Sequence, residues 1–330
     1  MAGQLWSVSA DGGYMYADKL SNLLRLELLP SVKFRQFCDI KEEEAQGKNK
    51  GDRWYWNVYS KVATKGRTLN ETVKMPETKF TITQQSATIT ERGNSVPFTG
   101  KLDDLSEQPV TEVIHKVLKV DAKESMDIGA WEQFDATPLR VAPTSGTSTT
   151  AVTLTTNGAT ATTNNVAFRK GHAAAIATTM KERNIPPFAN EDYYAIARPA
   201  AYDTMRDDLE SIHQYVETGL THIKNGEIGR YRGIRFVEQT HIPTGGANDS
   251  VIFDAYSETG DPWNNTASDW IFFMGADCAA EGIAILEEIR GKIPIDFGRD
   301  KGIAWYALNG FGLSHPVAAD ARIIKWDSAA

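Results

Sequence analysis

The chain has 330 residues, of which 41% are hydrophobic and 24% charged, and its formal net charge is −8. These proportions are typical of a globular protein and exclude a wholly disordered or collagen-like chain. The excess of acidic residues argues against a sequence-independent nucleic-acid binder, because such a protein needs lysine and arginine facing phosphate. Cys38 and Cys278 have no metal-ligand spacing, so we expect two free thiols rather than a disulfide.

The N-terminus carries no basic stretch followed by an apolar one, and we therefore expect no secretory signal. No stretch approaches the ~20 apolar residues that span a bilayer, so we expect no membrane partner. Residues 1–50 are expected to form an arm, with a short leucine-rich helix between Asp18 and Pro30. Residues 41–51 are charged and polar, which indicates a solvated linker.

Residues 51–100 predict the two legs of a long hairpin. Residues 54–59 are aromatic and β-branched with a period of two, and residues 80–83 and 87–90 alternate apolar and hydroxyl side chains. Each leg of about 24 residues would reach on the order of 70 Å, whereas a compact chain of this length has a radius of gyration of about 20 Å. The hairpin must fold back or project beyond its subunit. A projecting two-stranded ribbon needs another surface to lie on, which points to assembly.

The first long helix is predicted from Leu102 to about Met126. Its apolar stripe is formed by Val110, Val113, Ile114, Val117 and Leu118. Residues 151–163 predict a polar hairpin that turns at Asn157-Gly158.

The second half predicts a succession of helices and strands. Helices are expected at 173–184 and after Pro199, and the pair Glu287-Glu288 is also interpreted as helical. Strands are expected at 193–197, 234–237, 251–253, 270–274, 305–308 and 321–326. Helices and strands are segregated rather than strictly alternating, so the fold class is α+β.

No residue pattern supports catalysis. Phosphate-binding glycine loops, a zinc-binding His-Glu-x-x-His and a nucleophile elbow are all missing from the sequence. The six histidines are scattered, and the adjacent acids of Asp207-Asp208 and of Glu287-Glu288 would point apart on a helix. We therefore expect no enzyme, no cofactor, and no catalytic, cofactor-binding or metal-binding residues.

The order of these segments resembles the major capsid protein of tailed double-stranded DNA bacteriophages, with the Hong Kong 97-type fold. More narrowly, the chain is similar to the coat protein family of phage N4 and its relatives. The stretches that carry the resemblance are ATITERGNSV (87–96) running into KLDDLS (101–106), KERNIPP (181–187), YAIARP (194–199) and NGEIGRYRGIRFVE (225–238).

The resemblance implies a division of the chain into named parts. These are an N-terminal arm (1–50), an extended loop (51–100), a peripheral domain with a spine helix and β-hairpin (101–165), an axial domain with some peripheral strands (166–310) and a C-terminal strand that returns to the sheet of the peripheral or of the axial domain (311–330).

It also implies that the chain assembles with itself into hexamers and pentamers of an icosahedral shell around the genome. The expected partners are a portal protein at one vertex, a decoration or cement protein, and a scaffolding protein. Some relatives carry a large N-terminal scaffolding segment; because the loop begins near residue 51 here, the scaffolding protein is expected to be a separate chain. The shell would enclose DNA without sequence-specific binding. The acidic net charge suits this role, because a strongly basic lining would hold the DNA against packaging and ejection. The expected location is the virion, after assembly in the host bacterial cytoplasm.

On this hypothesis the functional residues are interface residues of the extended loop. Aromatic side chains would bury flat surfaces against the next subunit, and three cations would pair with its carboxylates. The residues are Trp54, Trp56, Tyr59, Phe80, Arg67, Lys79 and Arg92. The aromatic residues could also form cross-strand pairs within the loop, and both roles can hold together.

Two alternatives stay open. An encapsulin-like bacterial compartment of the same fold would bind cargo enzymes and contain no DNA. A cytosolic hydrolase with an unrecognised site would be a stable, active monomer.

Overall fold

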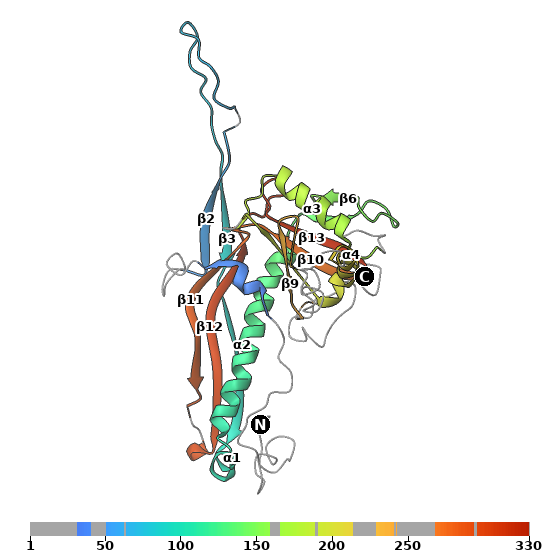
Figure 1. Cartoon of the computed structure of the whole chain (residues 1–330). Coiled ribbons are helices and arrows are strands. Elements are labelled where there is room, and N and C mark those ends of the chain that lie inside the picture. The colour runs from blue at the N-terminus through green and yellow to red at the C-terminus, as the bar shows by residue number, and fades with distance from the viewer. Residues whose placement is uncertain are drawn as a thin grey trace.

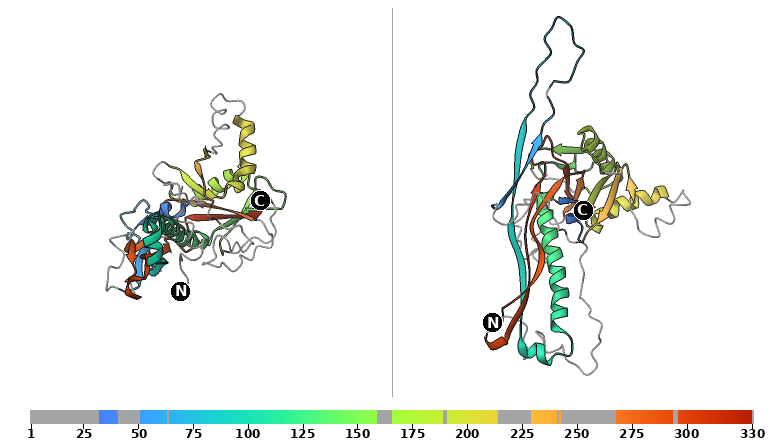
Figure 2. Two further views of the ribbon diagram at one scale, coloured as in Figure 1. Left: turned by 90° about the horizontal axis from the view of Figure 1, so that it is seen from below. Right: turned by 90° about the vertical axis from the view of Figure 1, so that its left-hand side faces the viewer.

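The computed structural model describes residues 32–40, 51–62, 64–158, 166–188, 191–213, 229–240, 242, 268–293 and 296–329. These residues form a long limb, a ribbon that projects beyond one end of the limb, and a rounded lobe (Figure 1). Two further views show the lobe to one side of the limb (Figure 2). The elements expected at 18–30, 41–50 and 251–253 lie outside the described residues.

The limb is a four-stranded sheet with two helices. The strands lie in the order β1-β11-β12-β4, and all neighbours are antiparallel except β1 and β11. The bounds are β1 (Cys38–Ile40), β4 (Thr90–Thr99), β11 (Ala279–Gly291), β12 (Asp300–Leu313), α1 (Gly100–Leu105) and α2 (Val110–Asp135). Thr99 pairs with Asp300, so the limb joins two parts of the chain that are distant in sequence.

Helix α2 is buried differently along its length. In the first half only Val110, Ile114 and Leu118 are buried, at the i, i+4, i+8 spacing of one narrow stripe. From Met126 to Phe134 most residues are buried, because this half lies in a core that also contains residues of the lobe sheet. The helix of 26 residues is about 39 Å long and links the limb to the lobe.

The lobe contains a mixed seven-stranded sheet in the order β6-β5-β13-β10-β7-β9-β8. Its strands are β5 (Arg140–Pro143), β6 (Val152–Thr155), β7 (Tyr193–Ala197), β8 (Arg230–Tyr231), β9 (Ile234–Glu238), β10 (Ser268–Met274) and β13 (Ile323–Ala329). Its helical segments are α3 (Lys170–Glu182), η3 (Pro199–Tyr202) and α4 (Asp203–His213).

Both faces of this sheet are buried. Strand β10 illustrates the consequence, because its residues 270–274 are apolar on both faces. Trp270, Phe272 and Met274 belong to the core that contains α2. Ile271 and Phe273, which point the opposite way, belong to a second core with residues of α3 and α4. The sheet is therefore a middle layer between α2 on one side and the lobe helices on the other.

The ribbon is formed by β2 (Arg53–Tyr59), β3 (Ile82–Thr88) and the residues between them. Ser60 and Thr81 continue the pairing, because Ser60 N–H donates to the Thr81 carbonyl and Thr81 N–H donates to Ser60 Oγ, both at 2.8 Å. Beyond them the described chain extends away from the limb (Figure 1). Of the two possibilities left open by the sequence, folding back or projecting, the structure shows a projecting hairpin. Residues 90–99, expected in its second leg, instead form β4 of the limb sheet.

Two expectations about individual elements were wrong, and a third reaches beyond the described residues. The helix expected at 102–126 is two helices, since Pro109 lacks the N–H needed inside a helix and caps α2 instead; Val117, expected in its stripe, is 45% exposed. Residues 152–155 form a hairpin with the preceding strand β5, and the second leg expected after Asn157-Gly158 lies largely outside the described residues. Glu287 and Glu288 lie in strand β11, where pairing with β12 overrides their helical propensity.

Candidate assembly surfaces

The root of the ribbon sits on the limb sheet at positions occupied by glycine. Trp54 is only 2% exposed, and a Cβ on Gly282 of β11 would lie 2.8 Å from its ring. A Cβ on Gly312 of β12 would lie 2.7 Å from the Trp56 ring. Because glycine has no side chain, the two indoles reach the sheet surface, and the direction of the ribbon is set there.

Hydrogen bonding and ring packing add to this seat. Trp56 Nε1–H donates to the Ser314 carbonyl at 3.2 Å, and the two indole rings lie 4.7 Å apart. Trp54, Ala87 and Ala280 form a small separate core. The ribbon root is thus rigidly attached to its own subunit.

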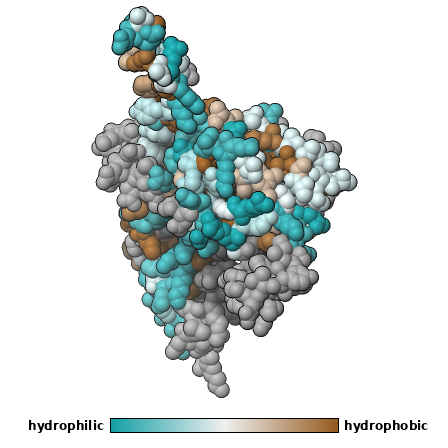
Figure 3. All heavy atoms as spheres, turned by 45° about the horizontal axis from the view of Figure 1, so that its top comes forward, coloured by the Kyte–Doolittle hydropathy of each residue, from teal (hydrophilic) through white to brown (hydrophobic). Residues whose placement is uncertain are grey.

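The end of the ribbon, residues 60–81, has a different character. Its exposed apolar side chains are Val62, Leu69, Val73, Met75 and Phe80. It carries five basic and two acidic residues, a net charge of +3, so the rest of the chain carries −11. Figure 3 shows hydrophilic and hydrophobic residues side by side on the projecting part. An exposed mixture of apolar and cationic groups is typical of a surface that binds a partner.

The seven predicted interface residues fall into two groups. Tyr59, Arg67, Lys79 and Phe80 are exposed on the ribbon, and the rings of Tyr59 and Phe80 lie 6.4 Å apart. Trp54 and Trp56 instead pack on the limb of their own subunit.

Arg92 also lies within the subunit, where β4 meets α2. Its Nη1 donates to the Ser125 carbonyl at 3.3 Å, and its guanidinium lies 5.5 Å from the centre of the Phe311 ring. The structure therefore brings Arg92 to α2 and leaves Arg67 and Lys79 on the projecting ribbon.

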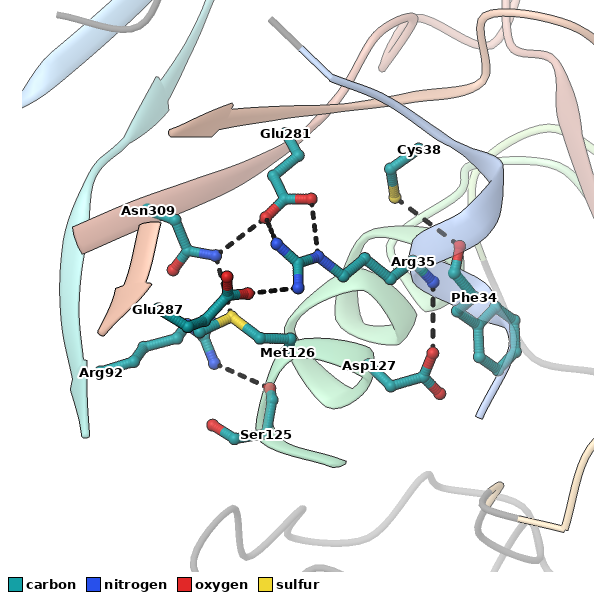
Figure 4. Close-up of polar contacts among 10 residues, drawn as sticks. All are labelled: Phe34, Arg35, Cys38, Arg92, Ser125, Met126, Asp127, Glu281, Glu287 and Asn309. Carbon is teal, nitrogen blue, oxygen red and sulfur yellow. Dashed lines mark hydrogen bonds and ion pairs between the residues drawn. The ribbon is translucent and has the colours of Figure 1, made fainter. Parts of the chain in front are cut away.

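A partly buried ionic network holds the segment that leads into β1 (Figure 4). Arg35 donates from Nε and Nη2 to the two oxygens of Glu281, at 3.0 and 2.9 Å, and from Nη1 to Glu287. Glu281 is fully buried and also accepts from Asn309 Nδ2 at 3.1 Å. Bidentate pairing of this kind fixes geometry as well as charge.

The same segment contacts the lobe. Phe34 is fully buried in the shared core, 5.1 Å from the ring of Phe134 in α2 and 5.4 Å from that of Phe272 in β10. The Lys33 N–H donates to Gln239 Oε1 at 2.8 Å, next to the end of β9. Residues 33–40 therefore join the limb sheet, α2 and the lobe sheet.

Sequence reasoning missed both the glycine seat and the Arg35 network. Gly310-x-Gly312 inside a strand is a signal for close backbone approach that could have revealed the seat. No local signal links Arg35 to Glu281, which lies 246 residues further along the chain.

Other kinds of site find no support in the described part of the chain. Among these residues there is no group of three or more histidine, cysteine or acidic side chains that could hold a metal ion. No helix described by the structure has the length and apolar character needed to cross a bilayer. Cys38 and Cys278 are buried as free thiols, and burial raises the pKa of the Cys278 thiol to about 12.

Comparison with known proteins shows to which family the chain belongs. Residues 83–323 match the family model described as phage capsid protein. The chain belongs to this family. It is therefore a phage capsid protein, a structural component of the virion that forms its shell and not an enzyme.

Solved capsid structures share the fold of this capsid protein. The capsid of cyanophage P-SCSP1u matches with a TM-score of 0.67 and 12% identity over 95% of this chain and 93% of that one. The capsid of Ralstonia phage GP4 gives 0.66 and 12% over 95% of each chain. The mature capsid of bacteriophage PhiM1 gives 0.64 and 14% over 94% and 91%. No curated protein matches the chain. The α+β, Hong Kong 97-type fold is confirmed, whereas membership of the phage N4 family stays a prediction.

Proposed function

We propose that this capsid protein assembles with itself into hexamers and pentamers of an icosahedral shell that encloses the double-stranded DNA of a tailed phage. In this arrangement residues 60–81 lie across a neighbouring subunit. The observation that carries the proposal is the ribbon itself, which is rigidly seated at its root and exposes an apolar and basic end beyond its own subunit.

The named parts of the chain acquire roles in this proposal. The limb corresponds to the peripheral domain, the lobe to the axial domain near the centre of each capsomer, and the ribbon, the projecting part of residues 51–100, to the extended loop. Tyr59, Phe80, Arg67 and Lys79 contact the neighbour, since they are exposed on the ribbon. Trp54, Trp56 and Arg92 support that interface from within, because their contacts hold the ribbon and β4 in place.

Further partners follow from the family resemblance. A scaffolding protein would act during assembly in the bacterial cytoplasm, a portal protein would occupy one vertex, and a decoration or cement protein could bind the finished shell. The acidic net charge of −8 supports a shell that encloses DNA without gripping it.

Shortening the ribbon tests the proposal. Residues 61–80 are replaced by Asn-Gly, which can close the hairpin because Ser60 and Thr81 are already hydrogen-bonded to each other. We expect a folded subunit with an unchanged circular dichroism spectrum that forms no closed shells by negative-stain electron microscopy.

The unaltered protein, expressed with its neighbouring phage genes, is the control and should give icosahedral particles containing DNA. Normal particles from the shortened variant would remove the role assigned to the ribbon. A uniform monomer from the unaltered protein under every condition would overturn the proposed function.

A further inference from the structure

A buried histidine of the lobe connects α3 to the loop that joins β5 and β6. This loop, residues 144–151, is exposed to solvent except at Ser148, which is partly buried. Strand β6 lies beside α3 in the lobe (Figure 1). His172, in the first turn of α3, is fully buried, and its Nε2 lies 2.9 Å from the Ser148 carbonyl oxygen. The imidazole thus links the helix to the middle of the loop.

The backbone of the loop passes close to α3 at a glycine. A Cβ on Gly171 would lie 2.6 Å from the Thr149 carbonyl oxygen. Inside the loop, Ser148 Oγ donates to the Ala151 carbonyl at 3.1 Å and accepts from the Ala151 N–H at 3.0 Å. The loop therefore has a defined conformation where it meets the first turn of α3.

The second ring nitrogen determines where the proton of the imidazole lies. The Arg169 backbone N–H, which can only donate, lies 3.2 Å from His172 Nδ1. Nδ1 must therefore accept, and the single proton of the neutral ring is on Nε2 and is donated to the Ser148 carbonyl. A second proton would be placed on Nδ1, where it would face another donor.

The charged groups around His172 offer little to an imidazolium. Arg169 and Lys170 are cations at the start of the same helix. The carboxylate of Asp208 in α4 is already engaged, because Arg169 Nη1 donates to its Oδ1 at 3.2 Å and the Lys170 N–H donates to its Oδ2 at 3.4 Å. A new positive charge on the ring would therefore share this carboxylate with two existing donors.

The other elements around His172 present apolar or uncharged groups. The rings of Phe168 and Trp326 lie 6.3 and 4.8 Å from the imidazole, measured between ring centres. The loop and β6 contain no charged residue. Lys325 of β13 and its cross-strand partner Arg140 lie on the opposite face of the sheet, where Lys325 Nζ is 3.6 Å from the centre of the Trp270 ring.

These surroundings lower the pKa of His172 from its ordinary value of 6.5. Burial is the largest cause; the hydrogen bond to the Ser148 carbonyl raises the pKa, the Arg169 cation lowers it and the Asp208 charge raises it. The unfolded chain binds this proton near pH 6.5, and the folded chain binds it only at lower pH. The stability that neutral His172 contributes is therefore fully present above pH ~6.5 and is lost as the pH falls through the lowered pKa.

We propose that His172 is an acid-sensitive switch, which holds residues 144–151 on α3 while its ring is neutral and releases them when the ring is protonated. The added proton on Nδ1 opposes the Arg169 N–H, so the ring leaves its position and the Ser148 carbonyl loses its donor. The switch acts within one subunit. It goes beyond the proposed function and does not depend on it.

Hydrogen–deuterium exchange of the full-length protein between pH 7 and pH 4.5 tests the switch, after correction for the intrinsic pH dependence of exchange. We expect peptides that cover 144–151 and 169–173 to lose protection at least tenfold at the acid end, while peptides of β12 keep theirs. Unchanged protection of 144–151 over this range would overturn the proposal.

His172→Gln separates protonation from packing. A glutamine amide oxygen can accept from the Arg169 N–H, as in a capping box, but glutamine does not titrate. We expect this variant to keep residues 144–151 protected at both ends of the pH range. His115→Gln, at an exposed position of α2, is the matched control and should lose protection in acid like the unaltered protein. Acid release that persists in His172→Gln would assign the response to another group and overturn the switch.

The ring itself is observed by ¹⁵N nuclear magnetic resonance of the unaltered subunit with labelled histidine. The signal that disappears in His172→Gln belongs to His172. We expect a proton on Nε2 and none on Nδ1 at pH 7, and a titration midpoint below 6.5. A proton on Nδ1 at pH 7, or a midpoint at or above 6.5, would overturn the proposal even if the variant is unstable.

Discussion

Asp127 is a residue at which burial and charge conflict. It is 2% exposed in α2, and its oxygens accept from the Arg35 N–H at 3.2 Å and from Gln239 Nε2. Burial raises the pKa of this carboxyl to about 6, although its hydrogen bonds act in the opposite direction. The carboxylate therefore links α2 to the Arg35 segment and to the end of β9 at an energetic cost.

This conflict predicts an unusual pH dependence. The pKa of Asp127 is higher in the folded state than its ordinary value of 3.8, so the folded state binds the proton more tightly. Its contribution to stability is fully present below pH ~4 and is lost as the pH rises through about 6, with a total change of about 3 kcal/mol. In Asp127→Asn this contribution is absent. The unfolding free energy of the native protein relative to this variant should therefore fall by most of that amount, about 2–3 kcal/mol, between pH 4 and pH 7.

Thermal or denaturant unfolding of the isolated subunit at several pH values measures this difference. Glu112→Gln, on the exposed side of the same helix, is the control and should run parallel to the unaltered protein. Parallel curves for Asp127→Asn would show that Asp127 does not titrate in this range.

At the scale of elements, the ribbon depends on the strands beneath it. The seat at Gly282 and Gly312 leaves no room for a Cβ, and a Cβ on Gly310 would lie still closer to its neighbour, the Thr88 carbonyl oxygen. Strands β11 and β12 of the limb thus determine where the ribbon strands β2 and β3 lie. The direction of the projecting end is a property of the limb sheet as much as of the ribbon.

Gly282→Ala is expected to displace Trp54 and tilt the ribbon. Its Cβ would lie 2.8 Å from the indole, and overpacking of this kind destabilises by about 1–3 kcal/mol. We expect a folded subunit with a lowered melting temperature and a strongly reduced yield of shells. Gly291→Ala in the same strand meets nothing within 4 Å and is the matched control. Equal shell yields from the two variants would contradict the role of the seat.

At the scale of the whole molecule, limb and lobe share one core and are joined by residues 33–40. Phe34 packs between Phe134 and Phe272, while Arg35 reaches into the limb to the buried Glu281. A short segment near the start of the described chain therefore makes contacts in both parts. Its loss should weaken the whole subunit rather than one element.

Arg35→Met should destabilise the subunit by about 3–5 kcal/mol, because it leaves the Glu281 carboxylate buried without its cation. Adding Glu281→Leu removes that charge, and we expect the double variant to regain much of the lost stability. Denaturant unfolding of the three proteins forms the measurement. If the double variant is no more stable than Arg35→Met, the loss does not arise from an unpaired buried charge.

The sequence predicted those features whose signals are local. The alternation of 54–59, 80–83 and 87–90 predicted the ribbon, and the apolar runs of 193–197 and 270–274 predicted strands. The wrong prediction at Glu287 and Glu288 has a physical reason. Both residues favour a helix locally, but the pairing of β11 with β12 places them in a strand.

By itself the sequence determined the α+β class, the hairpin and the family, because hydrophobic periodicity and the order of segments can be read directly from the chain. Tertiary structure alone decided that Trp54 faces its own limb, that Gly282 and Gly312 form the seat of the ribbon root, and that Arg35 meets Glu281. Each of these depends on the pairing of strands far apart in sequence, such as Thr99 with Asp300. Which side chains share a face after such pairing is set by register across the sheet, and no local pattern encodes it.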